Sequence, residues 1–161
     1  MKSPARLTEV FRSNGLRVTP QRMAIFEALY DNPLHPSAEG VYESVHAAMP
    51  TISLRTVYSV LAELAELDEI LQLDLGTGAA RFDPNTDPHH HLVCEVCGTV
   101  RDVSVDHPDV RPSPDDSEGF SITGTEIVFR GRCATCAFLA AGAPEPSTRS
   151  STKPSTTSNR K

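Results

Sequence analysis

Two Cys-x-x-Cys pairs constrain the fold of this chain more than any other feature. Cys94 and Cys97 form the first pair, and Cys133 and Cys136 form the second, in a chain of 161 residues. Two such pairs can present four thiolates to one ion, which is the usual tetrahedral set of structural zinc. A redox dithiol and buried cysteines without metal are the alternatives. The pairs therefore predict a zinc site that joins two distant segments rather than one that does chemistry.

The beginning of the chain bears on which of these interpretations applies. Residues 1–13 contain no continuous apolar stretch, and no run approaches the length that spans a membrane. We therefore expect a cytoplasmic protein with no membrane partner. Thiols stay reduced in the cytoplasm, so paired cysteines there are more typical of metal ligands than of disulfides.

Capping signals divide the first part of the chain into four expected helices. Their starts are predicted at Ser3, Thr19, Ser37 and Ser53, where a hydroxyl can accept from the first turn; proline follows the first two. Two short strands are expected over 70–75 and 79–83, with glycines at the turn between them. Helices followed by such a hairpin are typical of a winged helix-turn-helix.

The fourth expected helix has two different faces. Its buried stripe is predicted at Leu54, Val57, Leu61 and Leu64. Its outer face carries Arg55, Tyr58, Ser59 and Ala62. The second helix of a helix-turn-helix enters the major groove, where Arg55 or Tyr58 could reach bases or phosphates. The alternative is a solvated surface; the wing and the five basic residues among 1–22 favour DNA, although the net charge is −6.

The second part of the chain is expected to be a small sheet domain. Strands are predicted over 89–94, 99–104 and 126–130, and the proline-rich acidic stretch between the last two permits only a short helix. The predicted fold is α+β, with a winged-helix domain at 1–83, a hinge at 84–88 and a zinc-stapled domain at 89–139. Residues 140–161 are expected to be a disordered tail, because they have no apolar periodicity.

Histidines and aspartates suggest a second metal site less strongly. His89 and His91 point to one face of a strand, and Asp102 on the next strand could share that face. Solvated histidines on a polar strand are the alternative. His35 and Asp83 look ordinary by themselves, and periodicity alone does not join them to His89.

Five segments together resemble the ferric-uptake-regulator family. They are GLRVTPQR (15–22), HPSAEGVYESV (35–45), ISLRTVYSVLAEL (52–64), ARFDPNTDPHHHLVCEVCG (80–98) and FRGRCATC (129–136). The likeness covers about residues 5–137, with the motifs in family order. It implies a winged-helix DNA-binding domain, a hinge and an α/β dimerisation domain. It also implies a metal-loaded homodimer that binds palindromic operators in double-stranded DNA and represses transcription, and not an enzyme.

The resemblance also implies roles for individual residues. The structural zinc ligands would be Cys94, Cys97, Cys133 and Cys136. The regulatory metal ligands would be His35, Asp83, His89, His91 and Asp102. The base-reading tyrosine falls on Tyr58 and the minor-groove cation on Arg17. Ser59 stands where some members have a second DNA-contacting arginine, which puts that contact in doubt. The stretch 106–118 stands where the family has a helix, which is expected to be shortened.

The branch of the family rests on the regulatory ligand set. Three histidines and two aspartates, with Asp at position 102, resemble the peroxide-responsive repressors; iron-uptake members usually have Glu there. Such nitrogen and oxygen donors suit Fe(II) or Mn(II). The resemblance further implies that peroxide oxidises His35 or His89. An iron-uptake repressor is the nearest alternative. A zinc hydrolase, for which no general-base glutamate is evident beside the histidines, and a zinc-ribbon interaction module are more distant ones.

Overall fold

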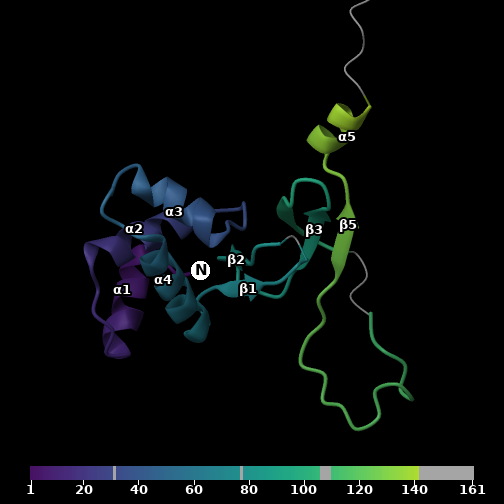
Figure 1. Ribbon diagram of the computed structural model, residues 1–161. Coiled ribbons are helices and arrows are strands. Elements are labelled where there is room, and N and C mark those ends of the chain that lie inside the picture. The colour runs from purple at the N-terminus through teal and green to yellow at the C-terminus, as the bar shows by residue number, and fades with distance from the viewer. Residues whose placement is uncertain (31, 77, 106–109, 142–161) are drawn as a thin grey trace, which may run out of the picture.

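A helical half and a smaller sheet half lie next to each other, joined by a two-stranded hairpin (Figure 1). The computed structural model describes residues 1–30, 32–76, 78–105 and 110–141. Helices precede strands along the chain, with one further helix at the end of the described part. The predicted α+β fold is therefore confirmed.

Four capped helices build the first half. They are α1 (Pro4–Ser13), α2 (Pro20–Leu29), α3 (Ala38–His46) and α4 (Leu54–Glu66). The side chains of Ser3, Thr19, Ser37 and Ser53 each accept from the backbone N–H three residues on, as predicted. Each such cap contributes about 1 kcal/mol because it satisfies a helix-end donor.

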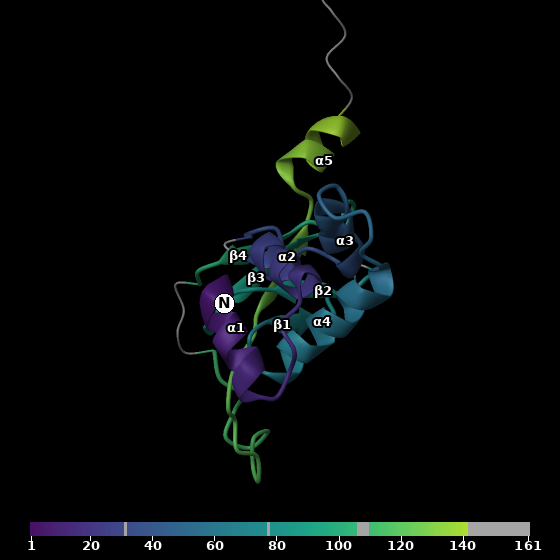
Figure 2. The same ribbon diagram turned by 90° about the vertical axis from the view of Figure 1, so that its left-hand side faces the viewer.

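The four helices pack around one another (Figure 2), and the side chains buried between them form the core of this half. Phe11 and Phe26 meet edge to face, with ring centroids 4.9 Å apart. Val57, Val60 and Leu61 of α4 are buried against them in the same cluster. Burial of each large apolar side chain contributes about 1.5–3 kcal/mol. The predicted stripe on α4 was wrong at one position, since Leu54 is half-buried whereas Val60 is in the core.

Five strands form two sheets. Strands β1 (Leu71–Leu73) and β2 (Arg81–Asp83) are antiparallel and make the wing. Strands β3 (His90–Cys94), β4 (Val100–Val103) and β5 (Val128–Gly131) form the second sheet in the order β4-β3-β5. β3 and β4 pair antiparallel, and β3 and β5 pair parallel. These strands lie within or next to the predicted ranges.

The wing packs against the second sheet. Leu73 and Leu75 form one buried cluster with Val93 and Val100. The Arg130 Nη1 donates to the Leu75 carbonyl at 2.7 Å, which ties β5 to the same hairpin. The wing therefore contacts the sheet as well as the helices, and it brings the residues at the end of β2 next to β3 and β4.

Two features differ from the sequence expectations. Residues 110–127 contain no helix, and this segment projects away from the sheet (Figure 1), so the short helix allowed there is absent from its described part. Helix α5 (Ala134–Ala140) was not predicted. It begins in the second cysteine pair, and its last residue falls in the expected tail; residues 142–161 of that tail lie outside the described residues. None of the described helices has the length and apolar character needed to span a membrane.

Candidate metal centres

One candidate site gathers donors from both halves of the molecule. A single donor atom from each residue can be chosen so that all the atoms lie within 4.8 Å of one another; the residues are His35, Asp83, His89, His91 and Asp102. The His35 Nε2 lies 2.7 Å from Asp102 Oδ1, and the His89 Nε2 lies 2.8 Å from Asp83 Oδ2. The structure thus brings together all the residues expected for the regulatory metal.

Backbone pairing explains why residues so distant in sequence meet. The Phe82 N–H donates to the Pro36 carbonyl at 2.9 Å, which holds the loop before α3 against β2. His35 and Asp83 are the neighbours of these two residues. On the other side, His91 pairs directly with Asp102 in the β3–β4 register. The two contacts place one His–Asp pair opposite the other.

His35 adopts a backbone conformation that its side chain does not favour. Its φ is +46°, one of two positive values among the described non-glycine residues. Such a conformation costs on the order of 1–3 kcal/mol and persists where the surrounding structure enforces it. It turns the imidazole inward, where the side chain is 1% exposed. The loop is therefore shaped to place this ring at the site.

The hydrogen bonds of the Nδ1 atoms of His89 and His91 leave the Nε2 atoms of both rings facing the centre of the site. The His89 Nδ1 lies 2.7 Å from the Asp87 carbonyl, and the His91 Nδ1 lies 3.0 Å from Glu126 Oε1. Both partners only accept, so both Nδ1 atoms must carry the proton. The two Nε2 atoms then face each other 2.9 Å apart with their lone pairs. A cation held between the two nitrogens would satisfy both lone pairs, as would a proton on one of them.

The negative charge around His35 also favours a bound cation at this site. Burial lowers the pKa of His35, but the close contact with Asp83 and the negative charges of Asp83 and Asp102 raise it more, so the net shift is upward. Burial raises the pKa of Asp83, but the contacts with His35, Asn85 and His89 lower it by more, so the net shift is downward. The buried His35 Nε2 has no well-directed hydrogen bond among the described residues. The donor set therefore fits a metal ion.

Two further residues support this site and were not identified from the sequence. Glu126 holds the His91 ring through Nδ1, as carboxylates commonly do for metal-binding histidines. Asn85 contacts both carboxylates of the site, through its backbone and its side chain. Glu126 precedes β5, and its proximity to His91 follows from the parallel β3–β5 pairing. The Asp83-Pro84-Asn85 turn is a local signal for the backbone contact of Asn85 with Asp83. No local motif indicates the contact of Asn85 with Asp102 or that of Glu126 with His91.

The four cysteines form the second candidate site, at one end of the β3–β5 sheet. Their sulfurs lie within 4.8 Å of one another, and none forms a disulfide. Cys97 Sγ and Cys133 Sγ are 3.8 Å apart. Zinc–sulfur bonds of about 2.3 Å in a tetrahedron give sulfur–sulfur distances of about 3.8 Å. The spacing therefore fits a four-thiolate zinc site.

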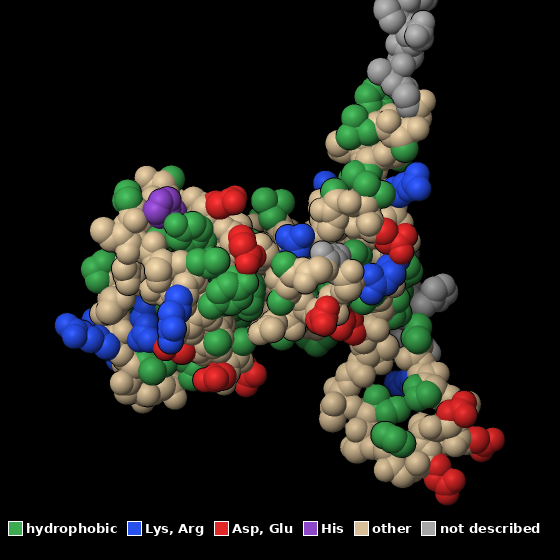
Figure 3. All heavy atoms as spheres, in the orientation of Figure 1, with side chains coloured by type: hydrophobic (Ala, Val, Ile, Leu, Met, Phe, Trp, Pro, Cys, Tyr) green, Lys and Arg blue, Asp and Glu red, His purple; other side chains and the backbone are tan. Residues whose placement is uncertain are grey.

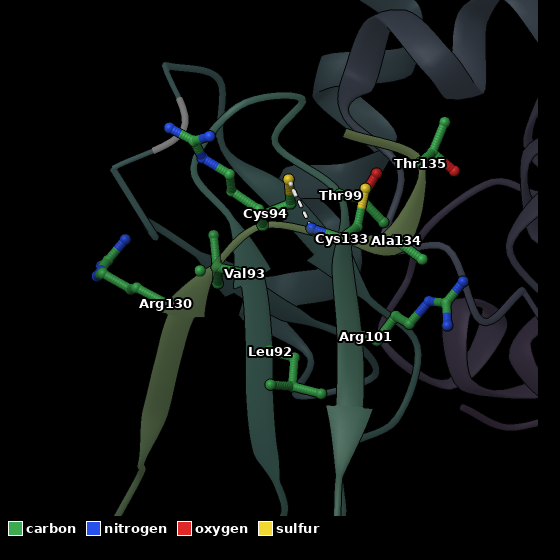
Figure 4. Close-up of a pocket in the computed structure, with 11 residues that line it drawn as sticks. Leu92, Val93, Cys94, Thr99, Arg101, Arg130, Cys133, Ala134 and Thr135 are labelled. Atoms are coloured by element: carbon green, nitrogen blue, oxygen red, sulfur yellow. Dashed lines mark hydrogen bonds between the residues drawn. The ribbon is translucent and has the colours of Figure 1, made fainter. Parts of the chain in front are cut away.

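Local backbone geometry orients these sulfurs. Gly98 has φ +67°, and its N–H donates to the Cys94 carbonyl at 2.9 Å, which closes the turn of the first pair. Cys133 is the N-cap of α5, and its N–H donates to Cys94 Sγ at 3.3 Å (Figure 4). Cys136 follows one turn later on the same helix face. The unpredicted helix thus presents the second pair to the first.

The pKa values of Cys94 and Cys136 are shifted in opposite directions by their neighbours in the cluster. The N–H groups of Cys133, Cys97 and Val96 lower the pKa of Cys94 to about 6. Hydrogen bonds with the Cys133 and Cys97 sulfurs, burial and the contact with Cys94 raise the pKa of Cys136 to about 12. Four adjacent thiolates are therefore unfavourable without a cation, and a bound metal would deprotonate all four.

The outer face of α4 is exposed, as predicted, at Arg55, Tyr58, Ser59 and Ala62. The Tyr58 hydroxyl donates to Glu39 Oε1 at 2.7 Å, which holds the ring against the start of α3. This bond lowers the pKa of Glu39 and raises that of Tyr58. The tyrosine is therefore already oriented in the absence of a ligand.

The basic residues near the start of the chain are less available than their number suggests. Lys2, Arg6 and Arg22 pair with Glu69, Glu9 and Glu63.

Arg12 and Arg17 form no ion pair within the described residues, and both are exposed. Lys and Arg side chains gather on the side of the helical half that faces away from the sheet (Figure 3). Among the basic residues near the start of the chain, only Arg12 and Arg17 are therefore without an ion pair in the described structure.

Comparison with known proteins places the chain in a wider group. The Ferric uptake regulator family model matches residues 13–130. The chain is 32% identical over 126 residues to the peroxide-responsive repressor PerR of Staphylococcus saprophyticus, covering 78% of this chain and 85% of that protein. It is 32% identical over 135 residues to the peroxide operon regulator of Bacillus subtilis, covering 80% and 89%. The solved Vibrio cholerae ferric uptake regulator aligns with a TM-score of 0.67 and 28% identity, covering 79% and 99%.

Proposed function

The chain belongs to the ferric uptake regulator family and is a metal-dependent DNA-binding transcription regulator, not an enzyme; we propose that peroxide is the signal it senses. The observation that carries the proposal is the mixed cage of three imidazoles and two aspartates, contributed by both halves of the molecule. The similarity of the chain to two peroxide regulators, over about four fifths of its length, also supports peroxide as the signal.

The two sites are proposed to hold different metals. Four thiolates in a closed set suit structural Zn(II) at the cysteine site. The nitrogen and oxygen donors of the other site suit Fe(II) or Mn(II), because thiolate is absent from it. Zinc would hold β3 and α5 together, whereas the second metal would be the regulatory one.

Repression is proposed to depend on the angle between DNA-binding helices in a homodimer. His35 comes from the helical half and Asp83 from the end of the wing, while His89, His91 and Asp102 come from the sheet half. An ion that contacts all five fixes one half against the other. A palindromic operator binds tightly only when the two recognition helices of the dimer have the spacing of its half-sites. The ion therefore shifts the protein toward the DNA-binding form by as much as it prefers that form.

Residues 1–83 would be the DNA-binding domain, 84–88 the hinge and 89–139 the dimerisation domain of a cytoplasmic protein. Tyr58 and Arg55 would face the major groove and Arg17 the minor groove. Ser59 offers a hydroxyl at most. The roles of Tyr58, Arg55 and Ser59 follow the position of α4 and the exposure of its outer face. That of Arg17 follows its exposure between α1 and α2.

Peroxide would act by destroying a ligand. Bound Fe(II) supplies the redox chemistry that activates hydrogen peroxide, and the chain places the rings of His35 and His89 beside it. In the net reaction one peroxide oxygen is added to the imidazole ring and the other leaves as water, so the ring loses two electrons and peroxide gains them. An oxidised ring binds metal poorly, which opens the cage and releases DNA. Mn(II) is far less reactive in the same place.

The first test is Asp102→Glu. The longer carboxylate can supply two oxygens to the ion and fill the position at which peroxide would arrive. We expect operator binding to remain metal-dependent while loss of binding on exposure to peroxide slows by about tenfold or more, a barrier increase of about 1.4 kcal/mol. The measurement is operator affinity against time in iron-loaded protein, with manganese-loaded wild type as the resistant control. Wild-type protein that keeps its affinity and shows no added oxygen at His35 or His89 would instead indicate an iron-uptake repressor.

The second test concerns the DNA contacts. Arg17 is exposed and has no ion pair in the described part of the chain, so its charge is free for the minor groove and the phosphates that border it. Arg17→Ala is expected to weaken operator binding and to reduce the slope of log affinity against log salt by about 1. Arg6→Ala is the matched control, because Arg6 is already paired with Glu9. An equal effect of both substitutions would contradict the assignment of Arg17.

A further inference from the structure

We propose that Asn85 is a clamp that makes both aspartates of the regulatory site offer a single oxygen to the ion. The proposal rests on the proposed function, since it concerns the same site, and it assigns a positioning role to a residue outside the ligand set. Asn85 follows β2 in the hinge segment and lies between the helical and sheet halves.

The hydrogen bonds of Asn85 divide each carboxylate into an inner and an outer oxygen. The Asn85 backbone N–H donates to Asp83 Oδ1 at 2.8 Å, and its side-chain Nδ2 donates to Asp102 Oδ2 at 3.3 Å. The other oxygens face the histidines, with Asp83 Oδ2 2.8 Å from His89 Nε2 and Asp102 Oδ1 2.7 Å from His35 Nε2. Asn85 therefore donates a hydrogen bond to the outer oxygen of each aspartate.

Asn85 is itself held in place from the opposite side. Its Oδ1 accepts from the Asp87 N–H at 3.2 Å, in the turn that leads to His89. Because the amide oxygen is used there, the amide nitrogen must point toward Asp102. The same turn therefore sets the direction of the clamp and the start of β3. Asp83 is fully buried, whereas the Asp102 side chain is 43% exposed and depends more on this contact for its orientation.

A cavity of about 340 Å³ lies beside this part of the site. It is lined by both aspartates, His35, Asn85 and Asn32, among others. A water molecule occupies about 30 Å³ in the liquid, so the space admits peroxide easily.

If each of the five residues gave one atom, an ion that takes six donors would keep one position for a small molecule. A second oxygen from either aspartate would fill that position. The clamp thus has a consequence for reactivity, because it keeps the position free.

The test replaces Asn85 with serine. Serine can still accept from the Asp87 N–H, but it removes the amide donor to Asp102. The probe is Co(II) added to the zinc-loaded full chain, because five-coordinate Co(II) absorbs visible light more strongly than six-coordinate Co(II). We expect Asn85→Ser to bind Co(II) as tightly as wild type while losing visible absorption, since the freed Asp102 can chelate. In iron-loaded protein, oxidation by peroxide should slow by about tenfold.

Asn32→Ser is the matched control, since Asn32 lines the same cavity but its amide nitrogen donates to the Ala28 carbonyl and not to a site carboxylate. The Asn32 Oδ1 accepts from the Leu34 N–H, and a serine hydroxyl can still accept from that group. It should leave the spectrum and the oxidation rate unchanged. A wild-type spectrum in Asn85→Ser overturns the clamp, even where wild-type protein responds to peroxide. Conversely, a wild-type protein that ignores peroxide contradicts the proposed signal, while loss of absorption in Asn85→Ser still supports the clamp.

Discussion

Substitution of His35 by alanine is expected to weaken operator binding about 150-fold in the presence of Mn(II), which corresponds to a coupling of about 3 kcal/mol. His35 is the donor that the helical half contributes from the loop before α3, and its Nε2 lies 2.7 Å from Asp102 of the sheet half. Without it, the ion would keep Asp83 at the end of the wing and the three donors of the sheet half, but it would no longer hold the loop before α3 against the sheet. Fluorescence anisotropy of a labelled operator against protein concentration measures this change.

Two controls separate loss of the bridge from loss of the fold. His46→Ala removes a histidine that stacks on Tyr42, with ring centroids 4.9 Å apart, and that contacts neither site. It should bind the operator as wild type does. Zinc content of His35→Ala should also be unchanged, because the cysteines are a separate cluster. If His35→Ala binds the operator with wild-type affinity and still responds to Mn(II), the bridging role is wrong.

Replacement of Cys97 by serine is expected to remove zinc and to unfold the sheet half. Cys97 is exposed, so the substitution itself leaves no cavity in a core. Structural zinc in small peptides contributes about 10–16 kcal/mol of apparent binding free energy, which equals or exceeds the whole stability of a typical domain. The only apolar cluster of the β3–β5 sheet among the described residues is small and is shared with the wing. Elemental analysis together with thermal unfolding followed by circular dichroism measures both effects.

Thr135→Ala provides the comparison for this experiment. Thr135 lies between Cys133 and Cys136 and is exposed, so its removal changes the same turn without changing the thiolate set. It should retain zinc and the wild-type melting temperature. The helices of the first half should remain folded in Cys97→Ser, since their core is a separate cluster. Full zinc content with unchanged stability in Cys97→Ser would exclude the four-thiolate site.

Local signals were sufficient to predict the helical half. The hydroxyls of Ser3, Thr19, Ser37 and Ser53 cap the helices as expected, because capping depends on residues only three positions apart. Helix α5 was missed for the same reason. Its N-cap is Cys133, which makes no side-chain capping bond, so no local start signal is present.

The regulatory site was only partly accessible from the residues themselves. Strand periodicity placed His89 and His91 on one face and allowed Asp102 to share it, and the register places His91 and Asp102 opposite each other. His35 and Asp83 came from the family resemblance, because their meeting depends on the long-range bond between the β2 backbone and the loop before α3.

Asn85 and Glu126 were not found at all. Neither residue type at either position is unusual, and only the folded arrangement shows what they contact.

The central claim is that one ion bridging the two halves controls DNA binding, and a manganese titration of operator affinity in unmodified zinc-loaded protein tests it most directly. Affinity should rise by about 150-fold as the site fills and should fall back when a chelator removes Mn(II), with zinc retained. Operator affinity that stays constant from metal-free to saturating Mn(II) would contradict the account.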